Sequence, residues 1–170
     1  AKGNSGKKKG GYDVDLYLSR YRNNVWTEPV LININQPEYW DSAPAFSPDG
    51  RTLYFASNRK GGYGGTDIYS AMMDTRGRFS RVRNLGPEIN TPGNENFPYV
   101  AEDAKLYFSS DTHPGYGGLD IFVVKRANGK TSIENLGQPM NSTGDDFGIF
   151  LFRPDRGFLT SNREGGKGDD

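Results

Sequence analysis

The single histidine and the carboxylates are the residues of this chain that could do acid–base chemistry. His113 is the only histidine, and the chain has no cysteine. A serine hydrolase needs a histidine within hydrogen-bond reach of both a serine and an acid, and no Gly-x-Ser-x-Gly elbow supplies that serine. His113 stands where another copy of the same local pattern carries Lys60. We therefore interpret His113 as an exposed loop residue and predict no catalytic residue.

Two adjacent carboxylate pairs, Asp145-Asp146 and Asp169-Asp170, are candidates for glycoside hydrolysis. That reaction needs two carboxyl groups about 5–10 Å apart on either side of a sugar. Neighbouring residues on a strand point to opposite faces of the sheet, so neither pair is predicted to act as a catalytic couple. The segment around Asp13 and Asp15 lacks the further ligands of a calcium loop, and the glycine-rich stretches lack the ending of a phosphate-binding loop. The sequence predicts no enzyme activity, no metal and no cofactor for this chain.

Acidic residues also recur at two fixed places in a repeated pattern. One set stands just before an apolar strand: Asp41, Glu95 and Asp145. We hypothesise that these acids lie at the mouth of a central channel and meet a basic partner. The alternative is that each accepts backbone N–H bonds from a neighbouring loop and stabilises the packing. The other set opens an Asp-apolar-aromatic triplet and is interpreted as structural, with Arg59 and Arg163 expected to pair with such acids: Asp15, Asp67 and Asp120.

The elements that carry these residues form a repeat. Residues 42–70 contain an apolar run, a Ser-Pro-Asp-Gly turn, a second apolar run, a glycine loop and Asp-Ile-Tyr, and residues 97–124 follow the same order. A partial third copy begins at Phe147. The Asp-apolar-aromatic triplets start at residues 15, 67 and 120, so the period is 52–53 residues. Such a period, with several short strands in each unit, is typical of a propeller or another repeat array.

Each full copy is predicted to be a four-stranded antiparallel sheet. In the first copy the expected strands are 43–47, 53–57, 67–73 and 79–84. The first strand is the most apolar, so we expect it to be the innermost strand and to be covered on both faces. Stacking such sheets around an axis leaves only short, protected edges. The predicted class is all-β, built of β-propeller blades.

Composition excludes several classes of function. The chain has 21 basic and 21 acidic residues, so it lacks the basic surplus of a nucleic-acid-binding domain. No stretch approaches the roughly 18 apolar residues of a membrane-spanning helix. Glycine and aromatic residues are both abundant, with 23 Gly, 10 Tyr and 10 Phe. That mixture favours twisted strands joined by tight turns.

Residues 43–69 resemble the PD40, or WD40-like, β-propeller repeat almost residue for residue. The second copy departs from its pattern at residues 101–104 and 111–112, and the third departs at 153–156. The linkers, residues 84–92 and 135–142, are similar to those of a subgroup in large envelope proteins of Bacteroidota. In that subgroup the propeller often precedes an OmpA-like peptidoglycan-binding domain, and some members belong to the type IX secretion machinery. TolB, a related propeller, binds a peptidoglycan-associated lipoprotein.

The repeat divides the chain into parts of one propeller domain. These parts are a flexible Gly/Lys loop or tail (1–11), the second half of a blade (12–34), two full blades (35–86 and 87–137) and the first half of a blade (138–170). The resemblance implies six or so blades in a complete propeller, and a closed ring takes at least four. We therefore expect a segment of a longer protein. The alternative is that two chains pair to complete one propeller, because the two half-blades are complementary in phase.

The resemblance implies a non-catalytic scaffold that binds protein partners in a Gram-negative envelope complex. It places the protein in the periplasm, associated with the outer membrane, with an indirect link to peptidoglycan. Two alternatives stay open. One is the propeller domain of a larger hydrolase such as an oligopeptidase, and the other is carbohydrate binding through exposed loop aromatics, namely Trp40, Tyr63 and Tyr116.

Overall fold

The computed structural model describes residues 14–166 of the chain. The glycine- and lysine-rich loop predicted at residues 1–11 lies outside the described residues. Within residues 14–166 the chain forms strands and no helix, so this part contains no helix that could cross a membrane. The all-β class predicted from the sequence is confirmed.

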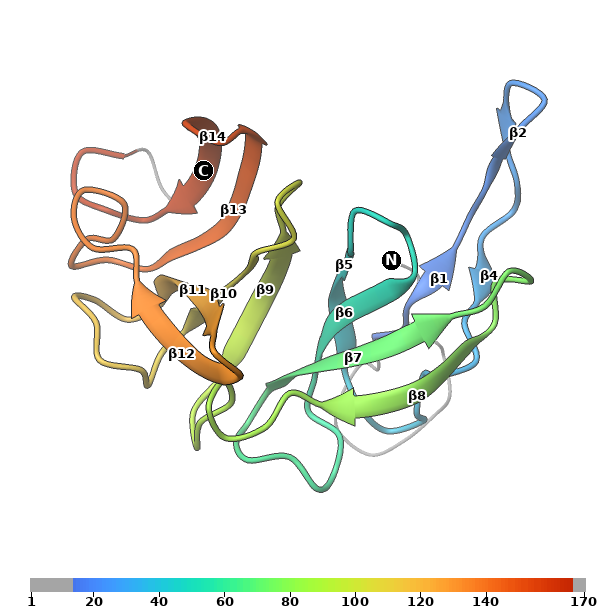
Figure 1. Cartoon of the computed structure of the whole chain (residues 1–170), viewed down its shortest axis with the longest axis horizontal. Coiled ribbons are helices and arrows are strands. Elements are labelled where there is room, and N and C mark those ends of the chain that lie inside the picture. Colours follow the sequence, from blue (N-terminus) through green and yellow to red (C-terminus); the bar gives the residue numbers. More distant parts are fainter. Residues whose placement is uncertain (1–13, 167–170) are drawn as a thin grey trace.

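Two four-stranded antiparallel sheets form the centre of the structure (Figure 1). In both sheets, strands that are neighbours in the chain are neighbours in space. The first sheet consists of β5 (Asp41–Phe46), β6 (Thr52–Ser57), β7 (Asp67–Met73) and β8 (Phe79–Asn84). The second consists of β9 (Glu95–Val100), β10 (Leu106–Ser110), β11 (Asp120–Ala127) and β12 (Lys130–Asn135). The repeat thus predicted both sheets, and each has the meander order of a propeller blade.

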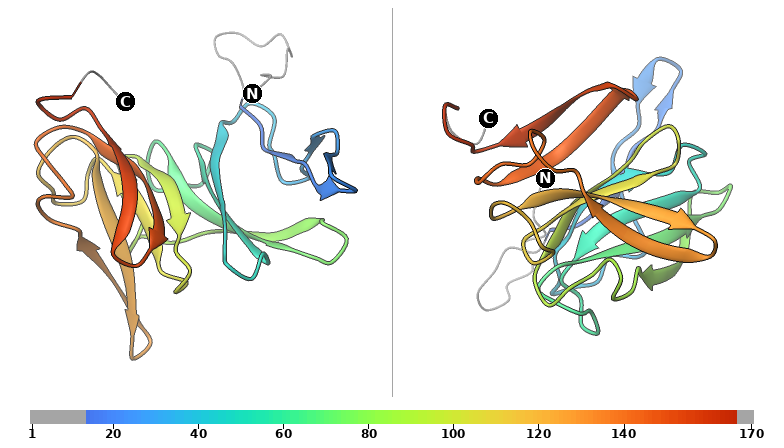
Figure 2. Two further views of the ribbon diagram at one scale, coloured as in Figure 1. Left: turned by 90° about the horizontal axis from the view of Figure 1, so that it is seen from above. Right: turned by 60° about the vertical axis from the view of Figure 1, so that its left-hand side comes forward.

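Two-stranded sheets flank this centre. After the second sheet, β13 (Asp146–Arg153) pairs with β14 (Arg156–Ser161). Before the first sheet, one hairpin contains β1 (Tyr17–Leu18) paired with β4 (Val30–Leu31), and β2 (Tyr21–Arg22) paired with β3 (Val25–Trp26). Asn23 and Asn24 turn this hairpin with φ of 50° and 62°, the left-handed conformation that a two-residue turn requires. The described sheets follow one another in chain order across the molecule and form a row rather than a closed ring (Figures 1 and 2).

The core lies between consecutive sheets, because each full sheet buries both faces. Phe55 and Tyr69 face the N-terminal hairpin, where they pack in one cluster with Leu16. Ala56 and Ile68 face the second sheet. This alternation is the period of two that a strand imposes on its side chains. Stacking of neighbouring sheets therefore supplies the burial that a lone sheet lacks.

The expectation that the first strand of each copy is covered on both faces is wrong. In β5 only Asp41 is buried, whereas most residues of β6 and β7 are. The first strands contain a bulge at equivalent positions, where Ala43, Phe97 and Gly148 all have positive φ (48°, 51° and 62°). A bulge turns the strand away from regular pairing. The apolar residues of β5, β9 and β13 consequently line a shared open groove instead of a packed interior.

Candidate functional site

Consecutive sheets are joined by a junction that occurs three times. At each one, the backbone N–H of the residue that opens a first strand donates to a carbonyl of the preceding copy. The three bonds are Asp41 N to Val14 O (2.9 Å), Glu95 N to Thr66 O (2.8 Å) and Asp146 N to Leu119 O (2.6 Å). Glycines permit this approach, because a Cβ on Gly64 would lie 2.2 Å from Gly93 O and one on Gly117 would lie 1.9 Å from Gly144 O. The glycine loops are thus where one copy touches the linker of the next.

The acids that open the first strands are buried at these junctions. Asp41, Glu95 and Asp146 are each 0% exposed. Strand register places them opposite Ser57, Ser110 and Ser161, respectively. Asp146, and not Asp145, is therefore the third member of this set, and the sequence alignment was wrong by one residue. Each carboxylate accepts a backbone N–H from the linker just before its strand, donated by Gln36 (3.1 Å), Thr91 (2.8 Å) and Ser142 (2.6 Å), respectively.

Asp145 instead occupies the position before the buried acid. It exchanges two hydrogen bonds with Asn162, from its own N–H to Oδ1 (2.6 Å) and from Nδ2 to its Oδ2 (2.8 Å). Asn94 makes a similar paired contact in the second copy, where it donates its N–H to Asp111 Oδ1 and its Nδ2 to Asp111 Oδ2. An acidic ring at a channel mouth would need carboxylates that are exposed to solvent. The acids that open the first strands are buried and therefore do not form such a ring. Their geometry supports the alternative, in which the acids hold the sheets together.

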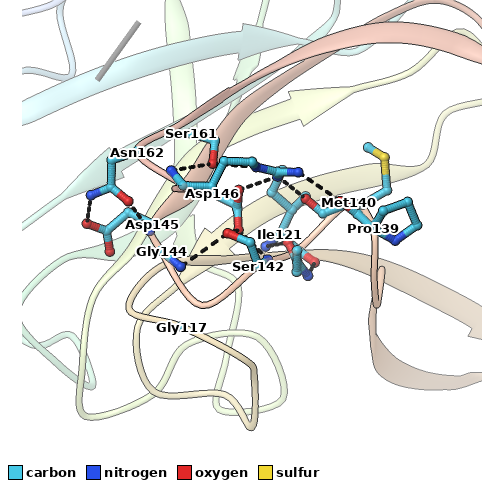
Figure 3. Close-up of polar contacts among 12 residues, drawn as sticks. Gly117, Ile121, Pro139, Met140, Ser142, Gly144, Asp145, Asp146, Ser161 and Asn162 are labelled. Carbon is cyan, nitrogen blue, oxygen red and sulfur yellow. Dashed lines mark hydrogen bonds and ion pairs between the residues drawn. The ribbon is translucent and has the colours of Figure 1, made fainter. Parts of the chain in front are cut away.

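Two of the junctions contain an arginine that covers the buried acid. Arg59 Nη2 lies 2.7 Å from Asp41 Oδ1, and its guanidinium lies 4.9 Å from the Phe55 ring centroid and 5.1 Å from that of Tyr69. In the third junction Arg163 Nη2 contacts Asp146 Oδ1 and also donates to the Met140 carbonyl at 2.8 Å (Figure 3). Both arginines thus pair with the acid that opens the first strand.

The environment of Asp146 favours its charged form. Burial by itself raises the pKa of this carboxyl, but hydrogen bonds from Ser161, Arg163 and Ser142 outweigh burial and hold the pKa below its ordinary value. The carboxylate therefore remains ionised at neutral pH and keeps its ion pair with Arg163.

His113 takes the arginine's place in the second junction, so the interpretation of an exposed loop residue is wrong. Its ring is half-buried, with centroids 5.8 Å from Phe108 and 5.2 Å from Phe122. Its Nε2 lies 2.8 Å from the Ile89 carbonyl, as Arg59 Nη2 contacts the carbonyl of Ile34. The acid of this junction then takes hydroxyl donors in place of a guanidinium, from Thr91 Oγ1 and Ser110 Oγ to Glu95.

Buried asparagines complete the junctions, and sequence reasoning missed them. Asn90 accepts the Ile68 N–H (2.8 Å) and donates to the Ile68 carbonyl (3.0 Å) and to Asn84 Oδ1 (2.8 Å). Asn141 makes the same three contacts, with Ile121 and Asn135. The side-chain amide thereby pairs with the strand backbone as a neighbouring strand would. A signal was present, because both linkers read Asn-Leu-Gly-x-x-x-Asn.

The acids of the Asp-apolar-aromatic triplets organise the glycine loops. Asp67 accepts the N–H groups of Tyr63 (2.7 Å) and Gly64 (3.2 Å). Asp120 accepts those of Tyr116 (2.9 Å) and Gly117 (3.1 Å) through Oδ2. Asp15, the third member, is half-buried just before β1. The carboxylates of Asp67 and Asp120 thus hold the backbone of their two glycine loops in place.

Exposed aromatic rings project from the backbone that this network fixes. Trp40, Tyr63 and Tyr116 are 51%, 49% and 49% exposed. Trp40 precedes the buried Asp41, and its N–H donates to Asn58 Oδ1 at 2.6 Å. The glycine loop of the first sheet contacts the start of β9, so the two glycine loops and Trp40 lie at the same end of the sheets. We call this end, with its three rings, the aromatic loop end.

Residues 14–166 contain no group of three or more His, Asp or Glu side chains that could hold a metal ion. The acids that open the first strands are buried inside the protein, whereas the rings of the aromatic loop end are about half exposed. The arrangement therefore offers a surface for contact, built on a stiff frame.

Solved structures that align with this chain include two of low sequence identity. No protein-family model matches the chain, and neither does any curated protein. TolB from Acinetobacter baumannii aligns over 86% of this chain and 34% of its own, with 19% identity and a TM-score of 0.48. A puromycin hydrolase mutant complexed with PGG aligns over 65% of this chain and 16% of its own, with 22% identity and a TM-score of 0.46. The chain thus spans about a third or less of either structure, and the assignment of blades rests on the sheets and junctions described above.

Proposed function

We propose that this chain is part of a non-catalytic β-propeller scaffold that binds protein partners through its aromatic loop end. The observation that carries the proposal is that the junctions bury their acids but leave large aromatic rings exposed. The buried acids bond internally, while three large rings stay about half exposed on backbone held by the same network. Aromatic rings on rigid backbone give a large contact area at a small entropic cost, and they are enriched in protein interfaces.

The cellular setting of this scaffold rests on the resemblance of its repeat and linkers. We place it in the Gram-negative envelope, in the periplasm beside the outer membrane, with partners that link it indirectly to peptidoglycan. In that setting the frame has no disulfide and is stabilised by the packing between sheets together with the junction network.

A second candidate function, glycan binding, uses the same rings. Sugar rings stack on exposed aromatic faces, and Tyr63 and Tyr116 occupy equivalent positions in consecutive copies. Repeated rings of this kind suit a repeating polymer. The two candidates differ in the ligand and not in the surface.

One experiment separates them. The 170-residue chain and its Tyr63→Ala/Tyr116→Ala variant are immobilised and incubated with periplasmic and outer-membrane extract, and bound proteins are quantified by mass spectrometry. Tyr21→Ala serves as the matched control, because Tyr21 is an exposed ring (58%) on the N-terminal hairpin and not at the loop end. We expect the same envelope proteins on the wild type and on Tyr21→Ala, and their loss from the double variant.

Equal retention by the double variant would refute the aromatic loop end as the binding surface. Cosedimentation with purified peptidoglycan provides the second arm. Wild-type binding to peptidoglycan alone, lost in the double variant, would replace the protein-binding proposal with the glycan-binding one.

A further inference from the structure

The outer hairpin of the first full sheet is rich in exposed arginine. The β7–β8 turn and most of strand β8, residues 74–83, contain four arginines and a single acid. All four side chains are exposed, and within residues 14–166 none of them forms an ion pair: Arg76, Arg78, Arg81 and Arg83. We call residues 74–83 the arginine hairpin.

This exposure is seen with the first sheet packed on both faces. On one side the N-terminal hairpin contacts β8, where Asn33 donates to the Phe79 carbonyl (2.8 Å) and accepts the Phe79 N–H (2.9 Å). On the other side Ala56 and Ile68 pack against the second sheet. The arginine hairpin therefore stays exposed although both neighbouring units are in place.

The turn uses its own carboxylate for backbone contacts. Asp74 accepts the N–H groups of Arg76 (2.9 Å) and Arg78 (2.8 Å). A further arginine, Arg20 of the N-terminal hairpin, donates from Nη2 to the Arg76 carbonyl at 3.4 Å and also forms no ion pair within residues 14–166. Like charges held near one another repel, so this turn favours a negatively charged partner.

The second sheet shows that the fold does not require these arginines. Strand register makes Glu134 of β12 the counterpart of Arg83, and Glu134 pairs with Lys125 at 3.6 Å. Strands β11 and β12 pair regularly, whereas β7 and β8 contain a bulge at which Arg81 has φ of 54°. A bulge redirects the side chains of its strand. The arginine hairpin is thus a feature of one copy and not of the repeat.

We propose that the arginine hairpin binds the phosphate groups of an anionic membrane surface. A guanidinium matches phosphate through paired N–H donors. Exposed guanidinium groups hold a single small anion weakly, because water and salt screen each contact. A bilayer instead presents many phosphates at once, and an anionic surface attracts every arginine that lies near it.

The surroundings of the arginines favour a membrane surface over a protein partner. Protein interfaces have an apolar centre that is enriched in aromatic residues. The aromatic residue of the arginine hairpin, Phe79, is instead 4% exposed and packs in the core. The exposed apolar side chain beside the arginines is Met72, whose Sδ lies 4.0 Å from Arg81 Nη1. The hairpin therefore presents cations without an aromatic anchor.

Membrane contact at this hairpin would set the orientation of the protein. Strand β7 runs from the glycine loop to the arginine hairpin, and its seven residues span roughly 20 Å. The aromatic loop end and the arginine hairpin thus lie at opposite ends of one strand. A chain bound through the hairpin keeps its aromatic loop end away from the bilayer and free for a partner. This orientation rests on the proposed function, whereas membrane binding itself does not.

Cosedimentation with lipid vesicles tests the proposal. The 170-residue chain is mixed with vesicles of phosphatidylcholine and phosphatidylglycerol in equal amounts, or of phosphatidylcholine alone. We expect binding to the anionic vesicles only, and its loss at about 1 M salt. Arg76→Gln/Arg78→Gln should lower the affinity roughly twenty- to thirtyfold, since each arginine near such a surface contributes about fivefold. The matched control, Arg126→Gln/Lys130→Gln, removes the same charge from exposed positions at the β11–β12 turn and should change the affinity by about twofold at most.

The outcomes that would overturn the proposal are distinct. Equal binding to both kinds of vesicle, or equal loss in the two variants, would refute it. Displacement by inorganic phosphate far beyond that by sodium chloride of equal ionic strength would mark a small-anion site instead. Loss of an envelope protein from Arg76→Gln/Arg78→Gln, without vesicle binding by the wild type, would assign the hairpin to an acidic protein.

Two further measurements keep the test clear. Both variants change exposed side chains, so their midpoints of urea unfolding should equal that of the wild type and verify that they fold. Tyr63→Ala/Tyr116→Ala should leave vesicle binding unchanged, because these rings lie at the opposite end of the sheets. Membrane binding and the proposed function can therefore fail separately.

Discussion

Replacing Asn90 by alanine tests the view that buried amides hold the junctions together. Asn90 is 2% exposed and makes three hydrogen bonds, two of them to the backbone of Ile68. After truncation, the Ile68 carbonyl still accepts the N–H of Leu85 (3.1 Å), and Asn84 Oδ1 still accepts that of Gly86 (2.9 Å). The Ile68 N–H then loses the acceptor that Asn90 Oδ1 provides, although Ile68 is fully buried.

The expected loss of stability follows from one unsatisfied donor, the buried N–H of Ile68. A buried, unsatisfied N–H costs about 1–3 kcal/mol, and the lost hydrogen bonds add about 1 kcal/mol. We therefore expect Asn90→Ala to lower the free energy of unfolding by about 2–4 kcal/mol, a large part of the roughly 5–15 kcal/mol of a typical domain. Asn141→Ala should cost as much, because its bonds to Ile121 and Asn135 repeat the pattern.

Urea unfolding followed by circular dichroism measures the change. With a slope of about 2 kcal/mol per molar, the midpoint should fall by roughly 1–2 M. Ser132→Ala, an exposed polar truncation on β12, is the control and should leave the midpoint unchanged. If Asn90→Ala behaved like Ser132→Ala, the amide would not support the junction, and the reasoning would be refuted.

Three further changes probe the charged parts of the junctions. Arg59→Ala should destabilise by about 3–5 kcal/mol in the same urea assay, because it leaves the carboxylate of Asp41 buried and uncompensated; a loss below 1 kcal/mol would contradict that ion pair. His113→Ala should lower the free energy of unfolding by about 1–3 kcal/mol, because ring packing and a hydrogen bond are lost. His113→Arg should keep most of the stability. The opposite order of the two variants would show that histidine and arginine are not equivalent at this place. The lowered pKa of Asp146 stabilises the fold above the ordinary aspartate value of about 3.9, and this contribution is lost as pH falls through the folded-state pKa. The stability gap between wild type and Asp146→Asn, measured by urea unfolding, should therefore narrow below about pH 4, and a gap that stayed constant would argue against the shift.

The sequence predicted the repeating sheets because strand period, turns and triplets are local features. It misplaced Asp145 because two acids stand side by side, and the choice between them depends on which one faces Ser161 across the strands. It misread His113 for a related reason. Arg59 follows Ser57 by two residues, whereas His113 follows Ser110 by three, so comparison by position hides that both side chains reach equivalent carbonyls. Contacts between copies depend on loop geometry, which an alignment of the repeat sequences does not record.

The junction network also limits where function can lie on this scaffold. The second and third junctions each use an acid, an amide and an imidazole or guanidinium to satisfy backbone groups, and buried backbone groups carry a cost when left unpaired. A side chain with that task cannot turn outward to a ligand without loosening the contact between two sheets. Under the proposed function, binding is therefore left to exposed side chains on fixed backbone, and Tyr63 and Tyr116 meet that condition in consecutive copies. The same carboxylates that close the glycine loops thus fix the backbone that carries these two rings.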